Sequence, residues 1–91
     1  MSSVKHNEVQ RRFVVELTSG ADPDTVAFVE YGIKDRLVDL YHTETVPKYR
    51  GKGYAKLAVD AALDWAKDKG LDVIPSCSYA KKIYEERGSK L

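Results

Sequence analysis

The sequence predicts an α+β fold: a mixed, mostly antiparallel sheet with two helices, in the order β-β-β-α-β-α. Segments with an alternating, β-branched pattern come first, and the period changes to that of a helix over residues 51–69. A short apolar run and a second helical segment follow within residues 71–87. The succession of strand, helix and strand predicts one parallel, right-handed joint in this sheet.

The first three predicted strands form an antiparallel meander. Turn formers at residues 19–24 and a short break at residues 34–35 separate them. The strands are expected over residues 9–17, 25–33 and 37–45. Strict alternation in the third strand would place Val38, Leu40 and His42 on one face.

The first predicted helix has an apolar stripe and a charged stripe. The apolar stripe consists of Tyr54, Leu57, Ala58, Ala61, Ala62 and Trp65. The charged stripe consists of Lys56, Asp60, Asp64, Lys67 and Asp68. Gly70 ends this helix, residues 71–77 form the fourth strand, and residues 78–87 form a second helix that Gly88 stops. A pair between Lys81 and Glu85 supports the second helix.

Length, charge and cysteine content restrict the class of protein. With 91 residues, the chain is expected to form a single minimal domain over residues 1–91. The 15 basic and 14 acidic residues give no overall field that favours nucleic acid or membrane. Cys77 is the only cysteine, no apolar run approaches the roughly 20 residues of a membrane span, and residues 1–12 lack the apolar core of a signal peptide. We therefore expect an intracellular protein, cytoplasmic or nuclear, with no membrane partner.

The start of the first helix lacks an ordinary cap. Gly51 and Gly53 stand where Ser, Thr, Asp or Asn would be usual, so the first main-chain amides have no evident side-chain partner. Such amides and the helix dipole together attract an anion, and glycine lets a phosphate approach closely. Basic residues surround this end: Lys48, Arg50, Lys52 and Lys56. Water or a backbone turn is the alternative partner for the amides.

Two better-known phosphate motifs are absent from this region. The G-x-x-x-x-G-K-[ST] spacing of a P-loop does not occur, and no Ser or Thr is placed to hold magnesium. No G-x-G-x-x-G follows a predicted strand, so a dinucleotide fold is not supported. We predict no metal site.

The same helix start carries a family resemblance. The segment RGKGYA, residues 50–55, matches the R/Q-x-x-G-x-G/A signature of the GNAT superfamily of acetyl-CoA-dependent N-acetyltransferases. In that family the signature likewise follows a strand and opens the central helix. The chain resembles this superfamily from about residue 37 to residue 88, and the first two strands fit by pattern only.

A second segment extends the resemblance. CSYAKKIYEERG, residues 77–88, is similar to the family motif N-x-x-A-x-x-x-Y-E-x-x-G-F. The residues in register are Ala80, Tyr84, Glu85 and Gly88. Cys77 stands in the place of the usual Asn, and Ser89 replaces the Phe. A cysteine after the fourth strand is typical of a compact branch of GNAT-like proteins.

The resemblance implies acetyl-CoA, or coenzyme A, as cofactor. The backbone of the signature segment would wrap the pyrophosphate, and the pantetheine arm would lie between the third and fourth strands, which splay apart in this family. The implied cofactor-binding residues are Val46, Arg50, Gly51, Lys52, Gly53, Tyr54, Ala55 and Tyr79. The adenosine phosphates would find partners among Lys48, Lys52 and Lys56.

The resemblance also implies direct attack of an amine on the thioester. Tyr84 matches the family tyrosine that protonates the departing thiolate, and Tyr79 competes for this role. Cys77 either lines the site or acts as a nucleophile. His42 and Glu44 are the candidate bases, although a strand His or Glu is commonly a packing or surface residue.

Two functions remain open at this point. The first is a minimal N-acetyltransferase that acts on an amine, such as a protein lysine, a protein N-terminus or a small amine. The second is a noncatalytic acyl-CoA-binding or protein-interaction module on the same fold. A nucleic-acid binder ranks last, because the net charge is close to zero and no aromatic RNA-binding motif is present.

Overall fold

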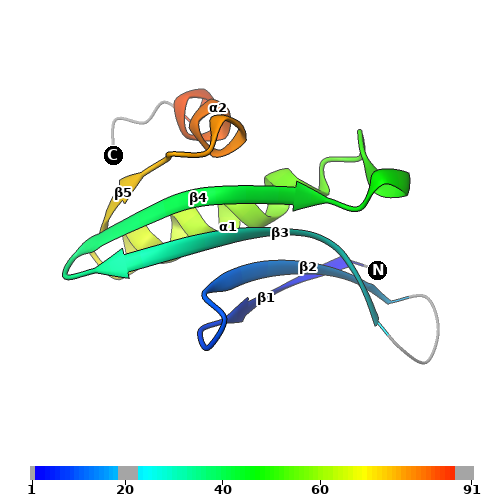
Figure 1. Ribbon diagram of the computed structural model, residues 1–91, viewed down its shortest axis with the longest axis horizontal. Helices are drawn as coiled ribbons and strands as arrows, with labels where there is room; N and C mark the ends of the chain where they lie inside the picture. Colours follow the sequence, from blue (N-terminus) through cyan, green and yellow to red (C-terminus); the bar gives the residue numbers. More distant parts are fainter. Residues whose placement is uncertain (1, 19–22, 88–91) are drawn as a thin grey trace.

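The computed structural model describes residues 2–18 and 23–87 of the chain. They form one five-stranded sheet in the order β1-β2-β3-β4-β5, with two α-helices and a short 3-10 helix (Figure 1). Helix α1, Tyr54–Asp68, packs against the sheet, and α2, Ser78–Glu86, contacts α1 and β4. Residues 19–22 of the turn predicted over residues 19–24 lie outside the described residues, as does the predicted helix stop at Gly88. Residues 23 and 24, also expected in this turn, belong to a strand.

The structure has one strand that the sequence analysis did not predict. Strand β1, Ser2–Asn7, pairs antiparallel with β2, Arg12–Thr18. The strand expected from residue 9 begins only at Arg12, because Val9 lies 95% exposed in the connecting turn. The Gln10 amide donates to Asn7 Oδ1 at 3.0 Å in this turn. Strand β1 is mostly polar and exposed, so its hydrophobic alternation is too weak to predict a strand.

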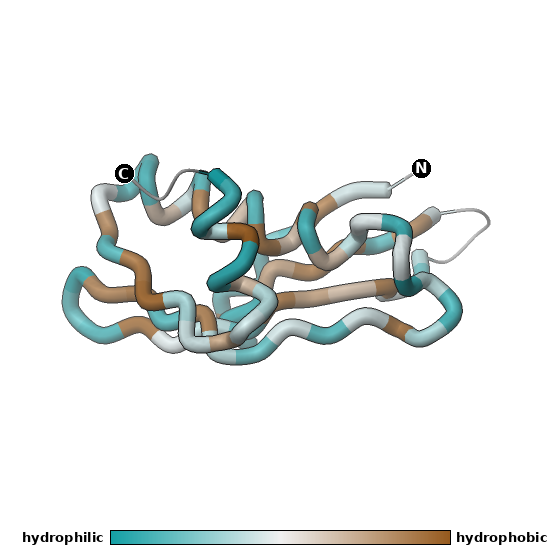
Figure 2. Tube along the Cα trace, turned by 90° about the horizontal axis from the view of Figure 1, so that it is seen from above, coloured by the Kyte–Doolittle hydropathy of each residue, from teal (hydrophilic) through white to brown (hydrophobic). Residues whose placement is uncertain are grey.

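The central strands confirm the antiparallel meander. Strand β3, Pro23–Lys34, pairs with β2 on one side and with β4, Leu37–Thr45, on the other. Their inward residues form the centre of one hydrophobic core beneath α1. The fully buried or nearly fully buried members from these strands are Phe13, Val15, Val26, Ala27, Val29, Tyr31, Val38 and Leu40. Hydrophobic and hydrophilic stretches alternate along the trace, as expected when one face of a sheet is covered (Figure 2).

A bulge in β4 overturns the predicted alignment of its side chains. Glu30 pairs with His42 but Tyr31 pairs with Leu40, so Tyr41 is an extra residue on β4. Val38 and Leu40 are completely buried, whereas His42 is exposed. The expectation that His42 shares their face was therefore wrong, since one inserted residue reverses the alternation.

The parallel joint is present, and it is short. Strand β5, Asp72–Ile74, pairs in parallel with β4 only from Leu37 to Asp39. The fourth strand was expected to reach residue 77, but it ends before Pro75. Strand β4 continues to Thr45 without this partner, so the two strands part beyond Ile74. The predicted fold class is confirmed, including one parallel pair in a mainly antiparallel sheet.

The buried face of α1 differs from the predicted stripe. Leu57 is 40% exposed although it was expected to be inside. The buried residues are Ala55, Ala58, Val59, Ala62, Leu63 and Ala66. Small alanine side chains let the helix approach the sheet closely, and Val59 and Leu63 fill the space beside them.

Helix α2 is held by contacts other than the predicted pair. Ala80 and Ile83 are its buried residues. Among the ion pairs of the described residues, none joins Lys81 to Glu85; the pairs at this helix run from Arg87 to Asp60 and Asp64 of α1. These ion pairs therefore fix the C-terminal end of α2 to α1.

An aromatic cluster joins β1 to the core. The His6 ring stacks on Phe13 at 4.0 Å between centroids and meets Trp65 edge-on at 4.8 Å. His6 Nε2 lies 2.6 Å from the Tyr31 hydroxyl. Burial lowers the pKa of His6 from its ordinary value of 6.5, and the charge of Glu8 opposes this shift only in part. The folded protein therefore favours a neutral His6.

We predict that stability falls in acid through His6. Because its folded pKa is lower than its unfolded pKa, the contribution is fully present above pH 6.5 and is lost as the pH falls below that value. Chemical unfolding, followed by Trp65 fluorescence, should show this loss between about pH 7.5 and pH 5, a range that brackets the ordinary histidine pKa of about 6.5.

The two histidines of the chain allow a matched control. His6→Gln should flatten this part of the pH profile, whereas His42→Gln, at an exposed position, should leave it unchanged. An unaltered profile in His6→Gln would show that other groups carry the acid sensitivity.

Candidate functional site

The segment between β4 and α1 is organised by its own backbone. The Val46 amide donates to Val26 O at 2.9 Å, and a 3-10 turn over Pro47–Tyr49 follows. The Tyr49 amide donates to Val46 O at 2.8 Å. The Val46 amide, which the family resemblance placed among the cofactor-binding groups, is thus already committed to the sheet.

The start of α1 is uncapped. Gly53 occupies the N-cap position with φ 81°, and no side chain of the described residues hydrogen-bonds to the first amides. Gly51 also has a positive φ of 79°, a conformation that residues with a Cβ rarely adopt. Built at either glycine, a Cβ would meet no atom within 4 Å, so open space lies before this backbone. The first turn of α1 contains no acidic residue.

A cavity of about 410 Å³ opens in front of this helix start. Its lining comes from the end of β4, the connecting turn, the first turn of α1 and the first turn of α2. The lining residues are Thr43, Glu44, Thr45, Tyr49, Arg50, Gly51, Gly53, Tyr54, Ala55 and Tyr79. The structure thus brings together most of the predicted cofactor-binding residues and the candidate base Glu44, while Val46 and Lys52 are not part of the lining.

Sequence reasoning missed three residues of this lining. Thr43 and Thr45 were hidden because the β4 bulge reverses the strand's alternation. Thr43 pairs with Val29 and Thr45 pairs with Ala27, and both partners are buried. This pairing is the signal that would have identified the two threonines as facing the helices. Tyr49 packs edge-on against Tyr54, with ring centroids 6.0 Å apart, and closes the cavity on the side of the turn.

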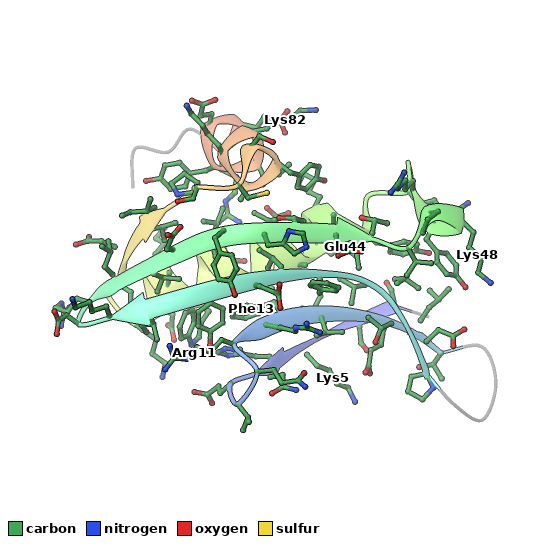
Figure 3. The ribbon with its side chains drawn as sticks, viewed as in Figure 1. Lys5, Arg11, Phe13, Glu44, Lys48 and Lys82 are labelled. Carbon is green, nitrogen blue, oxygen red and sulfur yellow. The ribbon has the colours of Figure 1, made fainter. Side chains whose placement is uncertain are left out.

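The basic residues form the outer rim of the site. Lys48 extends from the turn after β4, beyond Glu44 (Figure 3), and its Nζ lies 5.1 Å from the centre of the Tyr49 ring. Lys56 is held by Asp60, with Nζ 2.8 Å from Oδ2. Of the basic residues that the structure describes, Arg50 is the one that lines the cavity. The charge near the helix start is therefore positive, where an acidic side chain would be usual.

Cys77 lies one contact behind the cavity. It is the N-cap residue of α2, and its amide donates to Leu40 O at 2.9 Å. Its thiol donates to Thr43 Oγ1 at 3.2 Å, and Thr43 lines the cavity. Burial would raise the pKa of this thiol. When the thiol is ionised, however, the Thr43 hydroxyl and the Ala80, Tyr79 and Thr43 amides donate to the thiolate, and these hydrogen bonds outweigh burial and lower the pKa below 9.0.

The two tyrosines of α2 lie at different places. Tyr79 lines the cavity, and burial raises its pKa above the ordinary value, which keeps the phenol protonated. Tyr84 lines a second hollow of about 270 Å³ beside Leu71 and Val73, near the other end of α1. The family motif favoured Tyr84 at the site, but the fold places Tyr79, not Tyr84, in the lining of the cavity.

The two candidate bases pair with each other. His42 Nε2 and Glu44 Oε2 are 3.0 Å apart, and both side chains are well exposed. His42 does not line the cavity, whereas Glu44 does. Glu44 therefore borders the cavity, while its carboxylate pairs with His42 on the exposed side of β4.

The geometry described so far is that of an acyltransferase fold whose central helix begins with uncapped amides beside a cavity. Residues 12–89 match the model of the GCN5-related N-acetyl-transferase family, and the chain belongs to this family. The resemblance seen in the two motifs is thereby confirmed.

Vertebrate proteins are among the sequences that this chain resembles. Protein NATD1 of Gallus gallus is 39% identical over 83 residues, which cover 91% of this chain and 74% of that protein. Protein NATD1 of Homo sapiens is also 39% identical, with 72% of its length covered. Protein NATD1 of Danio rerio is 34% identical.

A solved structure supports the fold. The aminoglycoside N-acetyltransferase AAC(6')-Iy, determined in complex with CoA, superposes with a TM-score of 0.56 at 20% identity. The superposition covers 82% of this chain and 63% of that enzyme. At this identity the likeness establishes the architecture, a mixed sheet with a parallel β4–β5 pair.

We predict that Cys77 is more reactive than an ordinary thiol because of Thr43. Thr43→Val keeps the shape of the side chain but removes the hydroxyl that stabilises the thiolate, so the alkylation rate near pH 7.5 should fall by about 3-fold or more. Iodoacetamide labelling across a pH series, read by intact mass, measures this rate at the single cysteine.

Thr45→Val is the matched control, since Thr45 also lines the cavity but Thr43 is the hydrogen-bond partner of the thiol. Thr45→Val should leave the pH dependence of the Cys77 alkylation rate unchanged. Equal profiles for Thr43→Val and the unaltered protein would contradict the assigned hydrogen bond.

Proposed function

We propose that this protein is an acetyl-CoA-dependent N-acetyltransferase that transfers the acetyl group to an amine by direct attack on the thioester. The observation that carries the proposal is the uncapped, glycine-flanked start of α1, which opens into the cavity at the end of β4. Main-chain donors at a helix N-terminus fit a diphosphate. Family membership supports the reaction type.

The residues present fit coenzyme A. Gly51 and Gly53 leave space for a bulky anion, and Arg50 supplies a charge in the cavity. Lys48, Lys52 and Lys56 lie on the surrounding turn and first helical turn, where phosphates outside the cavity would meet them. The separation of β4 from β5 beyond Ile74 offers room for the pantetheine arm beside Thr43 and Thr45.

The chemistry needs one group that accepts a proton and one that donates a proton. Acetyl-CoA supplies a thioester whose carbon–sulfur bond breaks as the amine nitrogen forms its bond to the acetyl carbon. Glu44 would accept the proton from the amine, directly or through water, and His42 would hold the Glu44 carboxylate in place. Tyr79 would donate its phenolic proton to the sulfur. Tyr84 remains the alternative donor that the family motif indicates.

Cys77 has two possible roles in this scheme. As a neighbour of Thr43 it would shape the wall beside the reacting groups. As a nucleophile its thiolate would first take the acetyl group, which its lowered pKa favours. We place direct attack first, because Cys77 lies behind Thr43 and does not line the cavity.

The acceptor is proposed to be an amine from outside the cavity. The face of the sheet opposite α1 carries no helix in the described part of the chain (Figure 1), so a large acceptor such as a protein lysine or N-terminus could approach Glu44. We propose an intracellular location, where acetyl-CoA is present. No helix of residues 54–68 or 78–86 has the length and apolarity that a membrane span needs.

A noncatalytic acyl-CoA-binding or interaction module is the second candidate. It is favoured by the position of Tyr84, which lies away from the cavity although the motif assigns it to the thioester. In that case the start of α1 would still bind the anion, but no residue would act as a general acid or base.

We predict that coenzyme A stabilises the fold through the α1 start. At about 100 times its Kd, the ligand should add roughly 2.7 kcal/mol to the free energy of unfolding, measured as a rise in melting temperature. Gly53→Val should abolish this gain, because a β-branched side chain is strained at φ 81° and intrudes on the anion path.

Gly32→Val serves as the control, since Gly32 also has open space at its Cβ but lies within β3, away from the cavity. It should keep the full ligand response. If coenzyme A does not change the melting temperature of the unaltered protein, the proposal loses its basis.

We predict that Tyr79→Phe lowers kcat for acetyl transfer by about 10-fold, less than the roughly 10²- to 10⁴-fold that a general acid typically contributes, because thiolate is a good leaving group. Tyr84→Phe should have a smaller effect, and Cys77→Ala should retain activity if attack is direct. Mass spectrometry of an amine panel incubated with acetyl-CoA measures product and any acetylated Cys77 together.

The same experiment separates the two candidate functions. Binding of coenzyme A with no acetylated product from any amine would favour the noncatalytic module. A larger loss in Tyr84→Phe than in Tyr79→Phe would return the acid role to Tyr84.

A further inference from the structure

A network of four charged side chains joins α1 to the end of α2. Arg87 Nη2 lies 2.6 Å from Asp64 Oδ1, and Arg87 Nη1 lies 3.1 Å from Asp60 Oδ1. Nη1 also donates to the Asp60 main-chain oxygen at 3.3 Å. Lys56 shares Asp60, with Nζ 2.8 Å from Oδ2. One guanidinium thus binds two successive turns of α1.

The two aspartates are unfavourable without a cation between them. Asp60 and Asp64 are four residues apart on α1, so their like charges would repel each other in an isolated helix. Arg87 removes this repulsion by bridging them, and a planar guanidinium can bind both carboxylates at once, which a lysine cannot. The arginine side chain is 26% exposed, so the pairs are partly shielded from water.

The same face of α2 carries a site residue. Tyr79, Ile83 and Arg87 follow one another at spacings of four residues and share one stripe of the helix. Ile83 is 3% exposed and belongs to the core, and Tyr79 lines the cavity. Lys56 and Asp60 are close enough to influence the charge on Tyr79. The stripe therefore connects the ion pairs of Arg87 to the cavity.

The opposite end of α2 is held by Cys77. Its amide bonds to Leu40 O and its thiol to Thr43 Oγ1, both on β4. The helix is thus anchored to the sheet at one end and to α1 at the other. Without the second anchor, α2 could tilt about Cys77 and Ile83, and the first turn with Tyr79 would move relative to the start of α1.

We propose that Arg87 is a positioning residue for the site: by bridging Asp60 and Asp64 it fixes the tilt of α2, and so holds Tyr79 and the amides around Cys77 at the cavity. The role in catalysis rests on the proposed acetyl transfer, whereas the placement of Cys77 does not depend on it. The Arg87 side chain hydrogen-bonds to Asp60 and Asp64. Neither aspartate is among the lining residues of the cavity, so Arg87 acts on the site through the positions of the two helices.

The first test measures Cys77 alkylation, which needs no enzymatic turnover. In Arg87→Met the rate near pH 7.5 should fall by about 2- to 5-fold, the range expected when a helix N-terminus stops stabilising a charge. Arg87→Lys should recover part of the rate, since it can pair with one aspartate only. Lys81→Met, which removes a charge from the exposed face of α2, should equal the unaltered protein.

The second test compares kcat with KM for acetyl-CoA in the same variants. Arg87→Met should lower kcat while KM changes little, because the diphosphate groups belong to α1 and the preceding turn. If Arg87→Met does not fold, Asp64→Asn removes one of the two carboxylates more gently and should show the same split and the same alkylation change.

The outcomes are distinguishable. A lower melting temperature with unchanged alkylation and unchanged kcat would overturn the proposal and leave the ion pairs as simple helix–helix contacts. Changed alkylation in a protein that transfers no acetyl group would uphold the placement of α2 and reject the proposed enzymatic function.

Discussion

The structure depends on main-chain donors at the start of α1 that no side chain of the described residues satisfies. A helix beginning at Gly53, with positive φ values at Gly51 and Gly53, turns its first amides toward open space. Positive side chains surround this point where acidic ones would complement the dipole. In the function proposed above, a phosphate of coenzyme A would satisfy these donors.

The sheet places this helix start where a thioester could react. Strand β4 outlasts its three-residue pairing with β5, and its bulge at Tyr41 turns Thr43 and Thr45 toward the helices and His42 away from them. The cavity therefore lies between the uncapped start of α1, two threonines on β4 and Tyr79 on α2. Two local irregularities, a short strand and one extra residue, give a small sheet an opening that regular pairing would close.

Much of this architecture can be predicted from the sequence, for identifiable reasons. The helical period of residues 51–69 and the glycines before it mark α1 and its uncapped start, and two short motifs indicate the family. The strand β1 escapes prediction because only Val4 and His6 of its residues pack inward to any extent. The exposed Leu57 shows that composition reveals a helix more surely than the face it buries.

The catalytic groups are less predictable than the cofactor site. A bulge depends on pairing with a neighbouring strand, so the position of His42 could not follow from the alternation of β4 alone. Tyr79 and Tyr84 both lie on α2, and the crossing of α2 over α1, fixed by Arg87, decides which one reaches the cavity. Such contacts between distant segments leave no periodic signal in a single sequence.

The most direct test is a titration of the ¹⁵N-labelled protein with coenzyme A, in which the amide resonances are followed. We expect the largest shifts at Gly51, Gly53, Tyr54 and Ala55, and a much weaker response to pantetheine, which lacks the diphosphate. Saturable shifts confined to other parts of the molecule, or equal responses to both compounds, would contradict the claim that the α1 start binds the diphosphate.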